Sequence, residues 1–241
     1  MSSARQSRKK FRVSDSLNRQ LTAYAQIASA AGVSVLALAG ASEAKVVYTE
    51  THQVTHTGAP LYIDLNHDGI KDFLLRTNFY VGTSGTEIGL SAAGYRNADN
   101  VVAGRRYSRS GYFLSAASAL PGGVTIGPEG NFSVHFPFMA EELFTRVGNQ
   151  YSGLGAWAGR GRGVKNRYLG LKFVMGGEVH YGWARLSVTL GNQKQFDDVS
   201  GTLTGYAYET VPDKPIIAGQ ITGPDVITLH ETLGGLALGR K

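Results

Sequence analysis

The stretch from Arg167 to Leu190 constrains the fold more than any other part of the chain. It reads RYLGLKFVMGGEVHYGWARLSVTL, two runs of strand-forming residues joined by Gly176-Gly177. Both glycines can adopt the positive φ angles that a two-residue hairpin turn requires. The sequence therefore predicts a β-hairpin whose register starts with Met175 opposite Glu178 and continues to Tyr168 opposite Arg185.

The two faces of this hairpin have different chemistry. One face pairs Leu171 with Gly182 and Leu169 with Ala184, so we expect it to face a core. The other face would carry aromatic and basic side chains, namely Tyr168, Lys172, Tyr181, Trp183 and Arg185. Carbohydrate-binding modules stack sugar rings on flat aromatic side chains in this way, which makes the face a candidate glycan-binding surface. The alternative is that a second layer covers it.

The remaining chain favours strands over helices. Strands are predicted over 45–56, 60–65, 71–77 and 201–212, which are rich in Val, Thr, Tyr and Leu. The 32 glycines add many turns. One helix is predicted over 137–148, because Met139, Leu143 and Val147 recur at helical spacing between a proline and a glycine. These elements predict an all-β fold, a β-sandwich or jelly roll with one short helix.

A second segment, LYIDLNHDGIKDFLL at 61–75, points to a metal ion. The pattern D-x-N-x-D-G-x-x-D places oxygen-bearing side chains at alternate positions, and its residues are Asp64, Asn66, Asp68 and Asp72, with Ile70 offering its backbone carbonyl. Calcium takes about six to eight oxygen ligands, and Gly69 permits the sharp turn that brings them together. We expect a structural calcium site here, the alternative being a charged turn without an ion. An EF-hand is excluded, because its final glutamate is replaced by Leu75.

Two resemblances follow from these residues. The loop resembles the Asp-rich loops of FG-GAP-type propeller repeats, dockerins and thrombospondin-type modules, and in FG-GAP repeats such a loop joins two strands. The hairpin together with GYAYETVPDKPIIAG resembles uncharacterised exported bacterial all-β proteins of the PEP-CTERM-associated type. The chain's end, ETLGGLALGRK, lacks Pro-Glu-Pro, and its apolar stretch is too short to span a membrane. The resemblance therefore implies a secreted or surface protein rather than an anchored one.

The N-terminal residues 1–44 predict a secretory signal peptide. A basic start is followed by the apolar run AQIASAAGVSVLALAGASEA, and cleavage is expected after Ala44. The alternative, a membrane anchor, needs about 20 apolar residues, more than this run has. Six basic and two acidic side chains give this segment +4 of the total charge of +6, leaving 6 − 4 = +2 for the rest. A nearly neutral body disfavours nucleic acid as a partner.

The sequence assigns no catalytic constellation. The six histidines are scattered, and no G-x-S-x-G elbow, phosphate loop or cysteine is present.

We expect a signal peptide at 1–44, a β-sandwich domain at 45–211 and an extended tail outside the core at 212–241. The expected function is that of a non-catalytic surface or extracellular protein with a structural calcium site, whose partner is an extracellular glycan or surface matrix. The alternative is a secreted glycan-active hydrolase, with two carboxylates brought together from distant strands. An integrin-like adhesion fragment is a third reading, disfavoured by the missing repeats.

Overall fold

A computed structural model describes residues 45–81, 85–109, 112–132, 137–145, 151–191 and 199–230. The expected signal peptide at 1–44 lies outside the described residues, as does the end of the chain at 231–241. The described residues form an all-β sandwich, with one short 3-10 helix, η2 (Ala156–Gly161). Among them, no helix is both long and apolar enough to cross a membrane.

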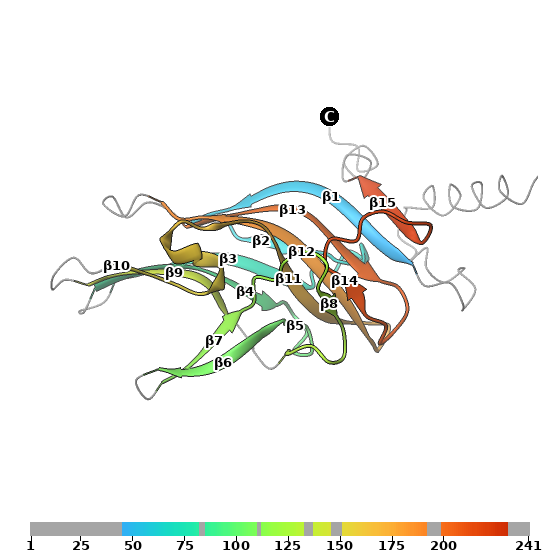
Figure 1. The fold of residues 1–241 in the computed structure, drawn as a ribbon, viewed down its shortest axis with the longest axis horizontal. Coiled ribbons are helices and arrows are strands. Elements are labelled where there is room, and N and C mark those ends of the chain that lie inside the picture. Colours follow the sequence, from blue (N-terminus) through green and yellow to red (C-terminus); the bar gives the residue numbers. More distant parts are fainter. Residues whose placement is uncertain are drawn as a thin grey trace, which may run out of the picture. The chain divides into compact units, whose positions relative to one another are not determined.

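Two large sheets form the sandwich (Figure 1). The first has six strands in the order β15 (Val226–His230), β1 (Val46–Thr55), β13 (Ser200–Glu209), β12 (Glu178–Thr189), β11 (Val164–Met175) and β5 (Val101–Val102). The second has the order β2 (Leu61–Ile63), β3 (Phe73–Val81), β4 (Gly85–Gly94), β9 (Phe138–Thr145), β7 (Tyr112–Ala117) and β6 (Gly104–Arg109), and β10 (Tyr151–Leu154) also pairs with β9. A small third sheet joins β8 (Thr125–Ile126) to β14 (Ile216–Ile217).

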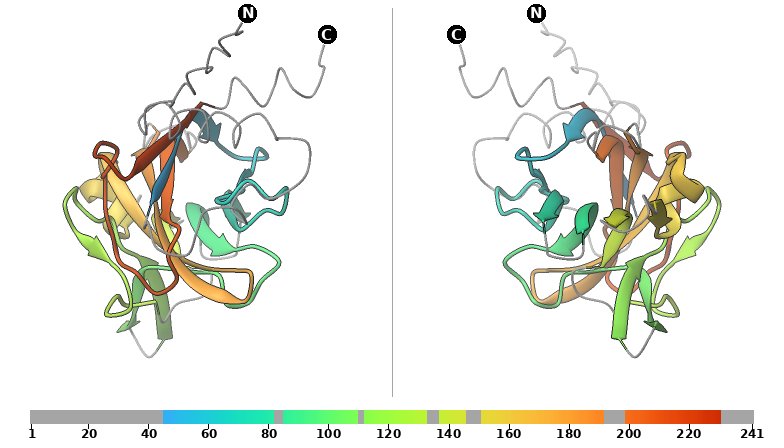
Figure 2. Two further views of the ribbon diagram at one scale, coloured as in Figure 1. Left: turned by 90° about the vertical axis from the view of Figure 1, so that its right-hand side faces the viewer. Right: turned by 90° about the vertical axis from the view of Figure 1, so that its left-hand side faces the viewer.

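The main core lies between the two large sheets. Buried apolar side chains from both of them form one cluster, including Leu75 and Leu90 of the second sheet and Phe173, Leu186 and Leu203 of the first. Figure 2 shows strands β2 to β4 opposite strands β11 to β13. This arrangement follows from the alternation of each strand, because successive side chains point to opposite faces of a sheet.

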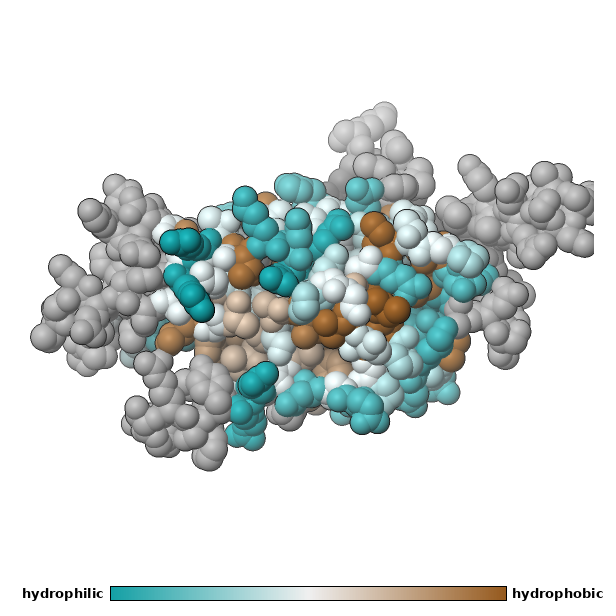
Figure 3. All heavy atoms as spheres, viewed as in Figure 1, coloured by the Kyte–Doolittle hydropathy of each residue, from teal (hydrophilic) through white to brown (hydrophobic). Residues whose placement is uncertain are grey.

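A second, smaller cluster lies on the other face of the six-stranded sheet. Here Ile126, Ile216 and Ala218, from and beside β8 and β14, pack with Tyr181 and Trp183 of β12. Figure 3 shows apolar side chains gathered on the molecular surface where β8 and β14 lie. The six-stranded sheet is therefore buried on both faces over part of its area.

The predicted hairpin and strands are confirmed. Strands β11 and β12 pair in the expected register, from Met175 opposite Glu178 to Tyr168 opposite Arg185, and Gly176 and Gly177 have φ angles of 62° and 88°. The strands expected at 45–56, 60–65, 71–77 and 201–212 are β1, β2, β3 and β13. Strand β13 lies between β1 and β12.

The helix predicted over 137–148 is wrong. Residues 138–145 form strand β9, which pairs with β4 on one side and with β10 on the other, while 146–148 lie outside the described residues. Met139 and Ala140 are fully buried in the core. Hydrogen bonding to both neighbours and this burial override the weak helical preference of a short segment.

The expectation that the chain leaves the core after Pro212 is also wrong. Strand β14 pairs with β8, and Ile216 and Ala218 are 1% and 2% exposed. Strand β15 then runs parallel to β1, with Val46 opposite Val226. The prolines and glycines of this segment set turns between short paired stretches, which sequence patterning does not distinguish from a free tail.

Candidate metal centre

The Asp-rich loop, residues 64–72, connects the antiparallel neighbours β2 and β3. Ile63 lies opposite Phe73, and the Asp72 amide donates a 2.8 Å hydrogen bond to the Ile63 carbonyl, which closes the loop at its base. Within it, His67 and Gly69 have φ angles of 61° and 88°. Gly69 takes this left-handed conformation at no steric cost, which explains a glycine at this position.

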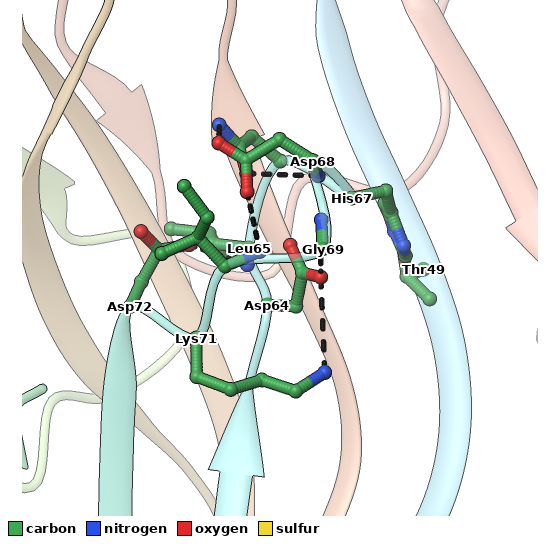
Figure 4. A network of polar contacts seen from close by, with 10 residues as sticks. Thr49, Asp64, Leu65, His67, Asp68, Gly69, Lys71 and Asp72 are labelled. Carbon is green, nitrogen blue, oxygen red and sulfur yellow. Dashed lines mark hydrogen bonds and ion pairs between the residues drawn. The ribbon is translucent and has the colours of Figure 1, made fainter. Parts of the chain in front are cut away.

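Hydrogen bonds from the loop's own carboxylate and amide side chains stabilise its conformation (Figure 4). The Gly69 amide donates to Asp64 Oδ2 at 3.0 Å, and the Ile70 amide donates to Asp68 Oδ1 at 2.7 Å. The Asp68 amide donates to Asn66 Oδ1 at 3.3 Å, and the side chains of Asn66 and Asp68 join through Nδ2 and Oδ2 at 2.9 Å. The sequence motif therefore folds as one local hydrogen-bonded unit.

One carboxylate oxygen of Asp64 takes no part in this hydrogen-bond network. Its Oδ1 is buried and has no hydrogen-bond partner, whereas Oδ2 accepts from Gly69 and lies 3.7 Å from Lys71 Nζ. An unsatisfied buried polar atom costs about 1–3 kcal/mol, and more when the group is charged. Asp64 is the first residue of the metal-binding pattern, and a cation bound to Oδ1 would remove this cost.

Asp72, the last residue of the pattern, is 6% exposed. Its Oδ2 accepts from the Leu65 amide at 2.7 Å, and Oδ1 lies 3.4 Å from Asn100 Nδ2. The pKa of Asp72 is raised to about 6, chiefly by burial and also by the nearby carboxylates of Asp68 and Asp64, which together outweigh the hydrogen bonds from Leu65 and Asn100 that lower it. The loop thus gathers negative charge that a cation would neutralise.

Asn100 is a member of this site that the sequence did not indicate. It is 3% exposed, and its Oδ1 accepts a 3.0 Å hydrogen bond from the Val174 amide of β11. Its own Nδ2 is thereby directed to Asp72. No spacing in the sequence relates position 100 to position 72, because the contact depends on how two separate loops meet.

His67, inside the motif, points away from the carboxylates and toward β1 (Figure 4). Its Nε2 lies 2.7 Å from the Thr49 hydroxyl, and its ring centroid lies 5.8 Å from that of Tyr206. His67 therefore attaches the loop to the first sheet and is not among the candidate ligands.

The donors fit a hard cation. All five candidate ligand residues, Asp64, Asn66, Asp68, Ile70 and Asp72, offer oxygen, which is the donor that calcium prefers. Within the described residues, no three His, Cys, Asp or Glu side chains lie together in a group that could hold an ion. Instead, Asn66 Nδ2 donates to Asp68 Oδ2, and Asp72 Oδ2 accepts from the Leu65 amide. Ion binding would exchange the bond between Asn66 and Asp68 for metal contacts.

The aromatic face of the hairpin is not an exposed surface. Trp183 and Tyr181 are 0% and 4% exposed, and Tyr168 packs edge-on against Trp183 with 5.2 Å between ring centroids. Lys172 is half-buried, as is Arg185, whose Nε donates to Thr204 Oγ1 at 2.8 Å. The expected glycan-binding surface is therefore wrong, and the alternative of a covering layer is right, because β8 and β14 lie over this face.

The described residues offer no arrangement that favours the hydrolase alternative. The buried carboxyl groups of the described residues are those of Asp72 and Glu209, and Glu209 is paired with Lys214 at 3.2 Å. In two surface pockets, one beside Leu120 and one beside Tyr95, none of the described lining residues is Asp or Glu. Comparison with protein-family models, with curated proteins and with solved structures gave no match.

Proposed function

We propose that this chain is an exported, non-catalytic surface or extracellular protein whose sandwich is stabilised by a calcium ion bound in loop 64–72. The observation that carries the proposal is the buried, unpartnered Oδ1 of Asp64 at the first position of the calcium-binding pattern. A divalent cation is the simplest partner for a buried carboxylate oxygen in a loop that carries two further carboxylates.

The exported setting agrees with the ligand set. Three carboxylates in a short loop give a modest affinity, and extracellular calcium-binding modules work with Kd values of about 10⁻⁴ to 10⁻³ M. The basic and apolar segment 1–44 and the resemblance to exported all-β proteins support the same setting. A chain without cysteine gains no disulfide there, so a bound ion would supply the cross-link between β2 and β3.

A melt of the full chain with calcium and with the chelator EGTA tests this proposal. At a calcium concentration of 100 Kd, linkage predicts about 2.7 kcal/mol of stabilisation, which for a domain of this size raises the Tm by roughly 5–10 °C. Asp68→Ala and Asp64→Asn should lose this rise. Asp225→Ala, which removes an exposed carboxylate elsewhere, should keep it.

The proposal fails if the wild-type Tm is the same in calcium and in EGTA. It also fails if Asp68→Ala retains the full rise, because calcium would then bind somewhere other than the loop. Terbium luminescence excited through nearby tyrosines provides an independent measure of occupancy in the same samples.

A further inference from the structure

A surface pocket of about 310 Å³ adjoins the candidate metal loop. Its lining comes from three segments, Tyr62 of β2, loop residues Gly69, Ile70 and Lys71, and Tyr95 and Arg96 of the turn after β4. One wall of the pocket is therefore the loop itself. None of the proposed metal ligands except Ile70 lines it, and Ile70 would coordinate through its carbonyl.

The pocket wall is built from fixed contacts. The Tyr95 amide donates a 2.7 Å hydrogen bond to the Asp72 carbonyl, and the Tyr95 ring packs edge-on against Tyr62 with 5.0 Å between centroids. The Arg96 guanidinium lies 5.5 Å from the centre of the Tyr95 ring. Arg96 has a φ of 61°, a conformation that few residues other than glycine adopt. The two tyrosines and Arg96 therefore form one packed unit beside the loop.

The chemistry of the lining is apolar and cationic together. Tyr62 and Ile70 are 40% and 60% exposed, so ring and aliphatic surface is presented to solvent. Lys71 and Arg96 supply two positive charges, and no described lining residue is acidic. An aromatic surface binds the C–H face of a sugar ring, and a guanidinium or ammonium group binds a carboxylate. A sugar that carries a carboxylate can bind both the aromatic surface and the cationic groups.

From this we infer that the pocket binds an acidic saccharide through a uronic acid residue, and that calcium in the adjacent loop controls this binding. The inference rests on the proposed calcium site. Lys71 Nζ lies 3.7 Å from Asp64 Oδ2, so one of the two cations is engaged by the loop. Asp64, Asp68 and Asp72 also repel any anion brought to the pocket.

Calcium weakens both effects, the pairing of Lys71 with Asp64 and the repulsion of anions by the loop carboxylates. It adds two positive charges to the loop and takes Asp64 as a ligand, which weakens the hold of Asp64 on Lys71. Lys71 is then available to the carboxylate of the ligand. By linkage, the saccharide must increase the affinity of the loop for calcium by the same factor that calcium increases the affinity for the saccharide.

Calorimetric titration of the full chain tests this inference, with three probes each in calcium and in EGTA. Hyaluronan tetrasaccharide carries sugar rings and carboxylates, chitotetraose carries rings alone, and glutarate carries carboxylates alone. We expect binding of the hyaluronan probe in calcium, weakened about tenfold in EGTA, the middle of the range usual for coupled sites. Chitotetraose and glutarate should each bind at least tenfold more weakly.

Two variants of matched charge locate the site. Arg96→Gln should weaken binding of the hyaluronan probe about tenfold, the usual effect of losing a charge-assisted hydrogen bond. Arg167→Gln, which removes an exposed arginine from β11 of the other sheet, should leave it unchanged. Tyr62→Ala should weaken binding of the hyaluronan probe and leave the calcium-dependent rise in Tm unchanged.

The outcomes separate this inference from the calcium site. If calcium raises the Tm and no probe binds, the pocket is refuted and the calcium site stands. Equal binding in calcium and EGTA refutes the coupling, and equal binding of glutarate refutes the saccharide as ligand. If calcium neither raises the Tm nor binds, both proposals are overturned.

Discussion

The burial of Asp72 makes the stability of the calcium-free protein depend on pH in an unusual direction. In the folded state the pKa of this carboxyl is about 6, against an ordinary value of 3.8, chiefly because the group is buried. Between these two pH values the folded chain binds more protons at this group than the unfolded chain does. Linkage then requires the free energy of unfolding to fall as the pH rises through this window.

The magnitude follows from the pKa difference. A change of the pKa from 3.8 to about 6 corresponds to about 3 kcal/mol in total, at roughly 1.36 kcal/mol for each tenfold change in proton affinity. Integrated between pH 4.5 and pH 7, about 2 kcal/mol of that total is lost. For a domain of this size, this lowers the Tm by roughly 4–8 °C.

Urea unfolding in EGTA, followed by tryptophan fluorescence, measures this effect, since Trp157 and Trp183 are both fully buried. The quantity to compare is the difference between the wild type and Asp72→Asn, because contributions common to both proteins then cancel. This difference should be about 2 kcal/mol larger at pH 4.5 than at pH 7. A difference that stays constant with pH would refute a buried Asp72 with a raised pKa. If the ionised carboxyl coordinates calcium as proposed, saturating calcium should offset the loss of stability as the pH rises through this window.

Two further predictions concern the fold, each with a matched control. Ile216→Ala should cost about 2–5 kcal/mol in the free energy of unfolding because a buried side chain is lost, whereas Ile217→Ala, at a 46% exposed neighbouring position, should cost well under half as much. Equal small costs would place β14 outside the core. Gly94→Ala should cost at least 2 kcal/mol, by rough analogy with overpacked cores, because its Cβ would collide with the Asn100 backbone carbonyl. Gly122→Ala, where the nearest atom is a Tyr168 ring carbon at 3.6 Å, should change stability by less than about 0.5 kcal/mol.

The register of the hairpin could be predicted because its determinants are local. A Gly-Gly turn fixes the loop length, and a period of two then assigns every side chain to a face. The wrong helix over 137–148 shows where local reasoning fails. Met139 and Leu143 are four residues apart, and an even spacing places two residues on one face of a strand as well as on one face of a helix. The partners β4 and β10 decide between the two, and neither is visible in this segment.

The covered face of the hairpin depends on contacts that are distant in sequence. Trp183 and Tyr181 are covered by segments near Ile126 and Ile216, which look like loops because prolines and glycines interrupt them. Pattern reasoning identifies the strands of a sheet and leaves open which connection folds back over it. The opposition of Gly170 and Trp183 was visible in the sequence, but it is compatible with an exposed face as well as with a covered one.

For the candidate metal loop, the sequence indicated the segment but not its surroundings. The spacing of oxygen-bearing residues is a local property, and so is the turn at Gly69. The burial of Asp72, its contact with Asn100 and the attachment of His67 to Thr49 all arise from packing against the first sheet. These contacts determine how a cation in the loop would act on the rest of the protein.

The loop belongs to the second sheet but lies close to three strands of the first, and Asn100 connects it to a fourth. His67 contacts Thr49 of β1. Burial raises the pKa of Tyr208 in β13, and the carboxylates of Asp68, Asp72 and Asp64 raise it further. A Cβ on Gly182 of β12 would lie 2.6 Å from the Ala207 backbone oxygen and 3.1 Å from Leu65, so that glycine leaves room for both β13 and the loop. Asn100 links Asp72 to Val174 of β11. A cation that fixes Asp64 and Asp72 in place would therefore stabilise the packing of one sheet on the other, so its loss should lower the free energy of global unfolding and not only that of opening the loop.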